Sequence, residues 1–410
     1  MTETLHVKCC IAGGGPAGMM LGFLLARAGI EVAVLEKHGD FLRDFRGDTI
    51  HPSTLEVMHE LGLLDQFLKR PHQEVPQLGG KIGQTEVVIA DFRHLPTRCK
   101  FIALMPQWDF LDFLAEAGQA YHGFHVMMDT EVTGLIEDGG KVLGGKARTP
   151  RGELEIRADL TVGADGRHSV VRAAAGLAST DLGAPIDVFW MRISKQPGDV
   201  NQSLGRFDAG VILVTIDRGD YWQCAYVIPK GGAEKIRAQG LPAFREKIVK
   251  LVPDLADRMG ELASWDDIKL LTVAVDRLER WHKPGLLCIG DAAHAMSPVG
   301  GVGINLAVQD AVASANILWQ PLSSGRLQES DLAAVQKRRM LPTRFMQRIQ
   351  VFMQNRVISA VLASDKPISA PLPIRLLNLF PVLRRFPARL VGMGIRPEHV
   401  HSPAEHGPLS

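Results

Sequence analysis

The sequence predicts an α/β protein, in which a parallel sheet flanked by helices is interrupted by a β-rich insertion and followed by further helices. Three observations lead to this prediction. A strand, a glycine-rich turn, a helix and a second strand follow one another within residues 6–36. Another strand–turn–helix unit occupies residues 286–310, and residues 187–275 are rich in short β-type runs. Strands that alternate with helices are typical of parallel sheets, whereas successive strands indicate a separate layer.

The first unit has the pattern of a dinucleotide-binding turn. Its apolar strand is followed by GGGPAG, a GxGxxG spacing that opens a helix, and the next strand ends in Glu36. Glycines allow the backbone to approach a pyrophosphate closely, and an acid at this position can bind a ribose hydroxyl. The pattern alone does not distinguish FAD from NAD. The candidate ligand contacts are Gly13, Gly15, Ala17, Gly18, Glu36 and Lys37.

The second unit reads LLCIGDAAHAMSPVGGVGINLAVQD and combines an acid at a strand end with a glycine-rich helix start. Asp291 stands where the strand 286–289 gives way to a short helix-like segment, which Pro298 ends. A helix start presents unpaired N–H groups and a positive dipole end. The combination suits a ligand with a polyol and a ring that can become anionic. The candidate contacts are Asp291, Pro298, Gly301, Val302, Gly303, Ile304 and Asn305.

The pattern GDAAHxxxPxxGxGxNxxxxDA in this unit resembles the flavin-binding motif of the single-component aromatic hydroxylases. These are the group A flavoprotein monooxygenases, with para-hydroxybenzoate hydroxylase as reference member. The resemblance implies a Rossmann-like FAD-binding domain of the glutathione reductase type with an inserted β-sheet substrate domain and C-terminal helices. It implies that Asp291 holds the ribityl chain of FAD and that residues 301–305 face the flavin N1–C2=O edge. It also assigns the first unit to FAD, and we expect His294 to be a structural hydrogen-bonding residue.

Two further segments match the family in order. In the loop before residue 52, the resemblance places Arg46 near the flavin and the nicotinamide donor, so Arg46 and Pro298 are the flavin-proximal catalytic candidates, with no acid or base assigned. A surface arginine in a solvated loop is the alternative for Arg46, and Asp48 and His51 on the same loop could face the substrate. Residues 53–56 (STLE) predict a capping box at a helix start. Gln107, before a predicted helix over 109–121, is assigned to the FAD phosphate or ribose.

The segment GADGRHSVVR, residues 163–172, resembles the family's DG motif. The resemblance places Asp165 and Gly166 near the pyrophosphate and the nicotinamide route, with Arg167 as a further participant. A plain Asp-Gly turn is the alternative. Ser169 is expected to cap the following helix, and residues 130–143 and 153–162 are predicted to form paired strands.

The β-rich region is predicted to be a substrate domain whose wall faces the flavin. By alternation alone, the candidate wall residues are Phe189, Met191, Val214, Trp222 and Tyr226, of which we assign Met191, Trp222 and Tyr226 to the substrate. Each of them could equally be sheet core. We expect the FAD-binding domain in three parts (1–74, 99–180 and 276–325), the substrate domain in two (75–98 and 181–275), and a C-terminal helical region over 326–410.

Composition narrows the alternatives. A net charge of +1 gives no electrostatic reason to expect nucleic acid as a partner. The five cysteines lack metal-ligand spacing and fit a reducing cytoplasm, and no metal is expected. The first residues lack a signal-peptide core, and no apolar run is long enough to span a membrane. Residues 366–397 carry six basic residues and no acid, which is compatible with peripheral membrane contact, although packing on the FAD domain or at the contact of a homodimer is favoured. A monomer is equally compatible.

The resemblance implies a monooxygenase that uses NADH or NADPH to reduce FAD, adds O2 through a flavin C4a-hydroperoxide, and hydroxylates an aromatic or related electron-rich, lipophilic small molecule. Catalysis by the cofactor explains why no Ser/His/Asp set, Cys/His pair or metal cluster is evident. Two alternatives stay open. One is an FAD-dependent reductase or dehydrogenase of the same fold, acting on an isoprenoid or quinone-like substrate, and the other is a non-catalytic flavoprotein. The W-x-W-x-I-P motif of flavin halogenases is missing, because YWQCAYVIP has one Trp at the wrong spacing.

Overall fold

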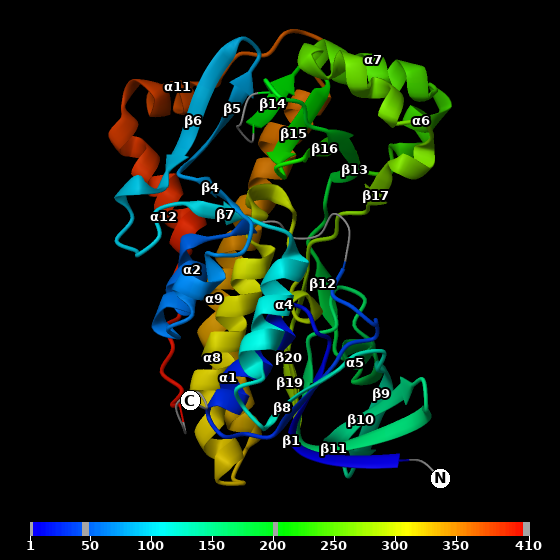
Figure 1. The fold of residues 1–410 in the computed structure, drawn as a ribbon, viewed down its shortest axis with the longest axis vertical. Coiled ribbons are helices and arrows are strands. Elements are labelled where there is room, and N and C mark those ends of the chain that lie inside the picture. Colours follow the sequence, from blue (N-terminus) through cyan, green and yellow to red (C-terminus); the bar gives the residue numbers. More distant parts are fainter. Residues whose placement is uncertain (1–2, 43–48, 200–203, 405–410) are drawn as a thin grey trace.

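The computed structural model describes residues 3–42, 49–199 and 204–404. Figure 1 shows an elongated molecule with one sheet in each half: helices α1, α4 and α8 lie beside the lower sheet, and α6 and α7 cover the outer side of the upper one. Both sheets are present together with C-terminal helices. The predicted α/β class is therefore confirmed.

The lower sheet has eight strands, and its main path runs β19-β20-β11-β1-β2-β8. Along this path, β1 pairs in parallel with β11 and β2, so that Cys9 stands opposite Leu160 and Val32. The strands are buried and apolar at their carboxyl ends, as expected where helices and strands cover both faces of a sheet. Their bounds are β1 (Glu3–Ala12), β2 (Val32–Leu35), β8 (Phe124–Met127), β11 (Gly152–Gly163), β19 (His282–Lys283) and β20 (Leu286–Cys288).

Three helices pack together beside this sheet: α1 (Pro16–Arg27), α4 (Gln107–Gly118) and α8 (Gly303–Ser323). The remaining strands, β9 (Glu131–Asp138) and β10 (Lys141–Thr149), form a hairpin that pairs with β11 through β10. The prediction that 130–143 is one strand paired with 153–162 was therefore wrong. Gly139 and Gly140, both at positive φ, turn the chain inside that range.

The upper sheet has seven strands in the order β17-β13-β16-β15-β14-β5-β6. One face packs against α6 (Ala233–Ala238) and α7 (Leu241–Leu251), with Phe189 and Phe244 in its core. The opposite face packs Val188 against Ile358 and Val299, which belong to other parts of the chain. The strand bounds are β5 (Gln77–Ile82), β6 (Thr85–Asp91), β13 (Ile186–Ser194), β14 (Leu204–Asp208), β15 (Val211–Asp217), β16 (Tyr221–Pro229) and β17 (Lys269–Leu271).

A small sheet and a helix join the two halves. The sheet contains β3 (Thr49–Ile50), β7 (Ile102–Leu104) and β4 (Gln73–Val75), and the helix is α2 (Pro52–Glu60), followed by α3 (Leu64–Phe67). The predicted capping box over 53–56 does not form. The N-cap is His51 instead of Ser53, so helix α2 begins two residues earlier than predicted, because Pro52 is favoured in the first helical position. The Thr54 hydroxyl instead donates to the Asn305 side chain at 2.7 Å.

The C-terminal region begins with α9 (Glu329–Met353), which continues through a π-helical turn η6 (Gln354–Ile358) into α10 (Ser359–Leu362). The chain then returns along the upper sheet as α11 (Leu372–Leu379), the 3-10 turn η7 (Pro381–Arg384) and α12 (Arg385–Met393). Both α11 and α12 pack against β6. Within the described ranges, no helix is both long enough and apolar enough to cross a membrane.

Candidate active site

The loops that follow β1, β11 and β20 meet at the carboxyl edge of the parallel sheet. The backbone amide of Ala164 donates to the Ala12 carbonyl at 2.8 Å, and the amide of Ile289 donates to the Gly163 carbonyl at 3.0 Å. Ligands of open α/β sheets bind outside the carboxyl ends of the strands. We call the three loops (residues 13–18, 164–169 and 290–303) the carboxyl-edge site.

The glycine turn after β1 is packed so closely that its spacing is required. Gly13 has φ +104°, and a Cβ there would lie 2.4 Å from the Ala164 oxygen. A Cβ at Gly18 would lie 2.0 Å from the Gly13 oxygen. Helix α1 begins after Gly15 without a side-chain cap, and a Cβ at Gly15 would meet no atom within 4 Å. Open space therefore lies in front of uncapped helix N–H groups, as a pyrophosphate requires.

The acid at the end of β2 points back to this turn. The Glu36 carboxylate accepts hydrogen bonds from the Gly14 amide and the His38 amide, each at 3.1 Å. Its oxygens have further acceptor capacity for a ribose hydroxyl. Lys37 is exposed beside it.

The DG loop supplies a buried acceptor for which the described residues provide no donor. One oxygen of Asp165, Oδ2, accepts from the Val171 amide at 3.2 Å, whereas the buried Oδ1 has no hydrogen-bond partner among the described residues. A buried carboxylate oxygen without a donor is costly, which indicates that a ligand or a water completes it. Ser169 caps α5 (Val170–Ala174) by accepting from the Arg172 amide, as predicted. The Arg167 side chain does not bond to Asp165 and instead donates to the Thr272 carbonyl at 3.1 Å.

The third loop follows β20. Gly290 and Asp291 lie in a short 3-10 turn, η4 (Gly290–Ala292), where a Cβ on Gly290 would come within 3.0 Å of the Ala17 side chain. Asp291 is half-buried and stands on the same edge as the glycine turn. Further along, Pro298 and Gly300 are exposed, and α8 begins at Gly303 without a side-chain cap.

Asn305 holds this loop and has no side-chain capacity left for a cofactor. Its oxygen accepts from the His51 amide at 2.9 Å and from the Thr54 hydroxyl at 2.7 Å. Its nitrogen donates to the carbonyls of Thr49 at 3.2 Å and Gly301 at 3.4 Å. The Asn305 side chain is thus a positioning group, so only its backbone remains a candidate cofactor contact. Val302 and Ile304 are buried beside it.

Three buried glutamines, which the sequence analysis did not single out, fasten the loop from behind. Gln350 accepts from the Ser297 amide at 3.1 Å and donates to the carbonyls of Ser297 and Val299, each at 2.9 Å. Gln347 donates to the Ala295 carbonyl at 3.2 Å, and Gln354 donates to the Ser297 hydroxyl. Their spacing along α9 and η6 places them on one helix face. Nothing in the local pattern distinguishes this face from a solvated one.

A buried charge network supports the same loop. His294 contacts Asp310 at 2.5 Å, and Arg339 donates to Asp310 at 2.9 Å and to Glu398 at 3.2 Å. Burial raises the pKa of Asp310, but His294 and Arg339 outweigh this effect and hold the pKa below its ordinary value. His294 is therefore a structural hydrogen-bonding residue, as expected.

The structure corrects the substrate wall. Phe189, Met191, Trp222 and Tyr226 all belong to the core beneath α7, on the sheet face turned away from the carboxyl-edge site. Val214 points to the other face, where it joins the cluster that contains Val299. Alternation separates the two faces of a strand but does not reveal which face is functional.

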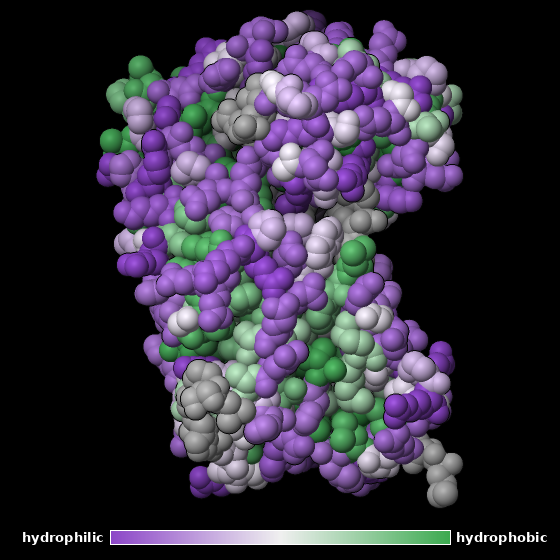
Figure 2. Space-filling model, viewed as in Figure 1, coloured by the Kyte–Doolittle hydropathy of each residue, from purple (hydrophilic) through white to green (hydrophobic). Residues whose placement is uncertain are grey.

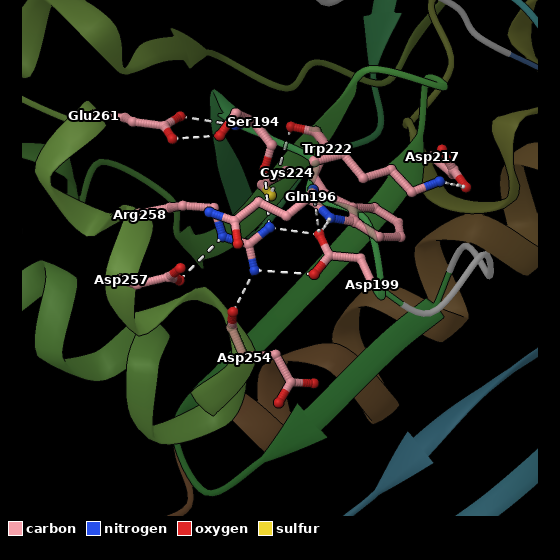
Figure 3. A network of polar contacts seen from close by, with 11 residues as sticks. Ser194, Gln196, Asp199, Asp217, Trp222, Cys224, Asp254, Asp257, Arg258 and Glu261 are labelled. Carbon is pink, nitrogen blue, oxygen red and sulfur yellow. Dashed lines mark hydrogen bonds and ion pairs between the residues drawn. The ribbon is translucent and has the colours of Figure 1, made fainter.

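Figure 3 shows why Trp222 is fixed in that core. Its Nε1 donates to Asp199 at 2.9 Å, and Asp199 pairs with Arg258 of the 3-10 segment η2 (Pro253–Glu261) at 2.5 Å. The nearly buried Arg258 lowers the pKa of Asp199 and also donates to the Ser194 carbonyl at 3.1 Å. This network closes the outer side of the sheet and is remote from the carboxyl-edge site.

The remaining candidates are placed as follows. Gln107 is half-buried in the first position of α4, and Gly166 has φ +84° in the DG turn. Arg46 and Asp48 lie outside the described residues. His51 is fully buried, with its Nδ1 2.7 Å from the Val391 carbonyl, so it does not face a substrate. Among the described residues, no group of His, Cys, Asp and Glu could hold a metal ion.

The carboxyl-edge site fits FAD. Gly13 and Gly18, which leave no room for a side chain, and the uncapped start of α1 suit a pyrophosphate. Asp165 Oδ1, which has no donor among the described residues, suits a hydroxyl or water beside it. Glu36 and Asp291 add acceptors at the ends of β2 and β20 for hydroxyl groups.

Comparison with known proteins agrees with this fit. Residues 6–349 match the family described as FAD binding domain. The chain is 33% identical to 6-methylpretetramide 4-monooxygenase of Streptomyces rimosus, over 93% of this chain and 92% of that protein. Rifampicin monooxygenase of Streptomyces venezuelae is 27% identical, and the match covers 76% of this chain but only 63% of that longer protein.

Solved structures share the fold. The p-nitrophenol 4-monooxygenase PnpA from Pseudomonas putida DLL-E4 superposes with a TM-score of 0.76 at 20% identity, covering 96% of this chain and 100% of that one. PqsL, a probable FAD-dependent monooxygenase from Pseudomonas aeruginosa, gives a TM-score of 0.72 at 21% identity, over 87% and 97%. The chain therefore belongs to the FAD-binding-domain family and is a flavin-dependent monooxygenase of the group A, para-hydroxybenzoate hydroxylase-like type.

Proposed function

We propose that the protein hydroxylates a small aromatic substrate, with NADH or NADPH as reductant and O2 as oxidant. The observation that carries the proposal is the position of the loop 298–300, in which Pro298 and Gly300 are exposed and Val299 is partly buried. Val299 packs against the sheet face that carries Val214, while the same loop leads into the uncapped start of α8 at the carboxyl-edge site. A flavin ring seated at this helix start would face the β-rich sheet, where a substrate can be held.

The roles of individual residues follow from these positions. Glu36 would bind a ribose hydroxyl, the N–H groups at the start of α1 would hold the pyrophosphate, and Asp291 would hold the ribityl chain. Asp165 would lie beside the pyrophosphate and accept from a cofactor hydroxyl or a water. The N–H groups of residues 301–305 would stabilise negative charge on the ring, because a helix start carries a positive dipole end. Lys37, Gln107 and Arg46 are proposed as further cofactor contacts.

FAD would supply the redox chemistry when bound. The overall reaction consumes one NAD(P)H, one proton, one O2 and the substrate, and it yields NAD(P)+, water and the hydroxylated product. The protein itself would position the substrate and exclude water, and the apolar side of the upper sheet around Val214 and Val299 is suited to this. We propose that residues 75–98 and 181–275 form the substrate domain, and that the other residues up to 325 form the FAD domain.

The substrate class is proposed from the relatives. One relative is named for action on 6-methylpretetramide and one solved neighbour for action on p-nitrophenol, so an aromatic ring, a phenol in the second case, is the expected class of substrate.

The test is a single-turnover experiment. The purified flavoprotein is reduced anaerobically with NADH or NADPH and then mixed with 18O2 and a panel that includes 6-methylpretetramide and p-nitrophenol. We expect a transient absorbance of oxygenated flavin and one 18O atom in the product. Flavin reoxidation that yields only hydrogen peroxide with every panel member, together with anaerobic reduction of a quinone or of an isoprenoid double bond, would replace the monooxygenase proposal by the reductase alternative.

A further inference from the structure

The segment from α11 to α12 presents an apolar surface to solvent. Seven of the thirteen exposed large hydrophobic residues in the described part of the chain lie within residues 372–386. We call them the apolar face: Leu372, Leu376, Leu379, Phe380, Val382, Leu383 and Phe386. Phe386 is 73% exposed, and Leu372 and Leu379 are each 69% exposed. In Figure 2, apolar residues gather over α11 at the upper left edge of the molecule. Contiguous apolar surface of this kind is typical of an interaction site.

The packing of α11 holds this face outward. Leu372, Leu376 and Leu379 follow one another at helical spacing on the exposed side of α11. On the opposite side, Asn378 accepts from the Val88 amide at 3.1 Å and donates to the Glu86 carbonyl at 2.7 Å. These two bonds to β6 fix the rotation of the helix, so its apolar stripe cannot turn toward the protein.

Helix α12 is fixed in the same way. Ala388 is fully buried, and a Cβ on Gly392 would lie 2.8 Å from the Leu95 side chain. Both small residues face inward, and Arg385, Phe386 and Arg389 are exposed to solvent.

The charge of the segment has one sign. Residues 366–397 contain six basic residues and no acid. Five of the six are exposed, namely Lys366, Arg375, Arg385, Arg389 and Arg396, whereas Arg384 turns inward to the Leu377 carbonyl at 2.9 Å. Apolar side chains surrounded by cations match the boundary between the acyl chains and the headgroups of an anionic bilayer.

We propose that the apolar face docks on the surface of an anionic lipid bilayer, with the exposed arginines on the headgroups. A second copy of the chain fits less well. A symmetric dimer would place the same face on itself and would bring Arg375, Arg385 and Arg389 against their counterparts, with no acid in the segment to neutralise them. Desolvating like charges in this way is unfavourable. The proposal concerns where the enzyme resides and does not depend on its reaction.

Vesicle flotation with the full-length, FAD-loaded protein tests this proposal. The vesicles contain phosphatidylcholine alone or phosphatidylcholine mixed with phosphatidylglycerol. We expect binding only to the mixed vesicles, and at least a tenfold loss of binding in two variants. One removes apolar contacts (Leu379→Gln with Phe386→Gln), and the other reverses charge (Arg385→Glu with Arg389→Glu).

Matched controls separate the face from general surface change. Leu270→Gln removes an exposed leucine on β17, and Lys235→Glu with Lys250→Glu reverses two exposed charges near α7. Both controls should bind as the parent does, and flavin absorbance and Tm confirm that every variant is folded. Absence of binding to both vesicle types overturns the proposal. It is also overturned if the face variants bind like the controls, or if light scattering shows a dimer that the face variants dissociate while vesicles are ignored.

Discussion

The substitution Gln350→Met tests whether this buried glutamine holds the loop 295–299 in place. Methionine is close to glutamine in length and volume, so Gln350→Met removes hydrogen bonds without opening a large cavity. The three groups that lose their partner are the amide of Ser297, the carbonyl of Ser297 and the carbonyl of Val299. All three lie in the loop that leads to the start of α8.

The size of the effect follows from these three bonds. A net contribution of about 1 kcal/mol for each bond sets an upper value of about 3 kcal/mol for the loss. Part of this loss is recovered if water reaches the loop, which the exposure of Pro298 and Gly300 permits. We therefore expect the loop to be destabilised by about 1 to 3 kcal/mol. Since about 1.4 kcal/mol is a factor of ten, the Ser297 amide should exchange its hydrogen on the order of tenfold to hundredfold faster.

Hydrogen exchange read by mass spectrometry over 295–302 measures this opening directly, and a fluorescence titration measures FAD affinity. Faster exchange confined to this peptide, with weaker FAD binding, is the expected outcome. Asn355→Met is the matched control, because Asn355 is an exposed amide on the same helical run. If exchange in Gln350→Met equals that of the parent protein and of the control, the glutamine does not hold the loop and the reasoning is wrong.

Three further outcomes are expected. Burial lowers the pKa of His51 from its ordinary value of about 6.5 to about 4. Protonation therefore favours the unfolded chain, so the free energy of unfolding should be highest above pH 6.5 and should fall by up to about 3 kcal/mol as the pH drops to 4. Denaturant titrations of the parent protein and of His51→Gln across this range should show that the variant lacks this loss. Arg339→Met should lower the free energy of unfolding by about 3 to 5 kcal/mol, because it leaves the buried Asp310 charge with one partner fewer. Adding Asp310→Asn to this variant should recover part of the loss in Tm. An undiminished Tm in the single variant would contradict the role of the network. Val214→Phe should change KM and the product pattern, whereas Met191→Leu should change only stability, by less than about 1.5 kcal/mol; the reverse result would restore the original wall assignment.

The parts of the site that the sequence predicted are those whose geometry depends on the backbone. The turn around Gly13 and Gly18 leaves no space for a Cβ, so only glycine fits at these two positions and the sequence shows this directly. Glu36 could also be predicted, because parallel strands end at the same edge of the sheet, so the acid at the end of β2 lies near the turn that follows β1. Local chemistry of this kind can be recognised without knowledge of distant contacts.

The supports of the site could not be predicted in this way. Gln347, Gln350 and Gln354 are polar residues at helical spacing, a pattern that usually indicates a solvated face. They are buried because the irregular loop 295–299 has backbone groups that must find partners inside the protein. That demand arises more than fifty residues away in sequence. The pairing of Asp310 with Arg339 depends on tertiary packing in the same manner.

The substrate wall was assigned to the wrong face of the sheet because both faces of β13 and β16 are buried. Alternation along β13 and β16 separates a set with Phe189 and Tyr226 from a set with Val188 and Ala225, and both sets are buried. Helices α6 and α7 follow β16 directly within the β-rich region, so they cover one face of its sheet. The space beneath them is filled by large side chains. A face that receives a ligand needs room instead. The bulky set therefore belongs under α7, and the smaller set faces the loop of the carboxyl-edge site through Val299. The size of the side chains, together with the origin of the covering helices, therefore separates the face covered by α7 from the face we propose for the substrate, which periodicity alone does not do.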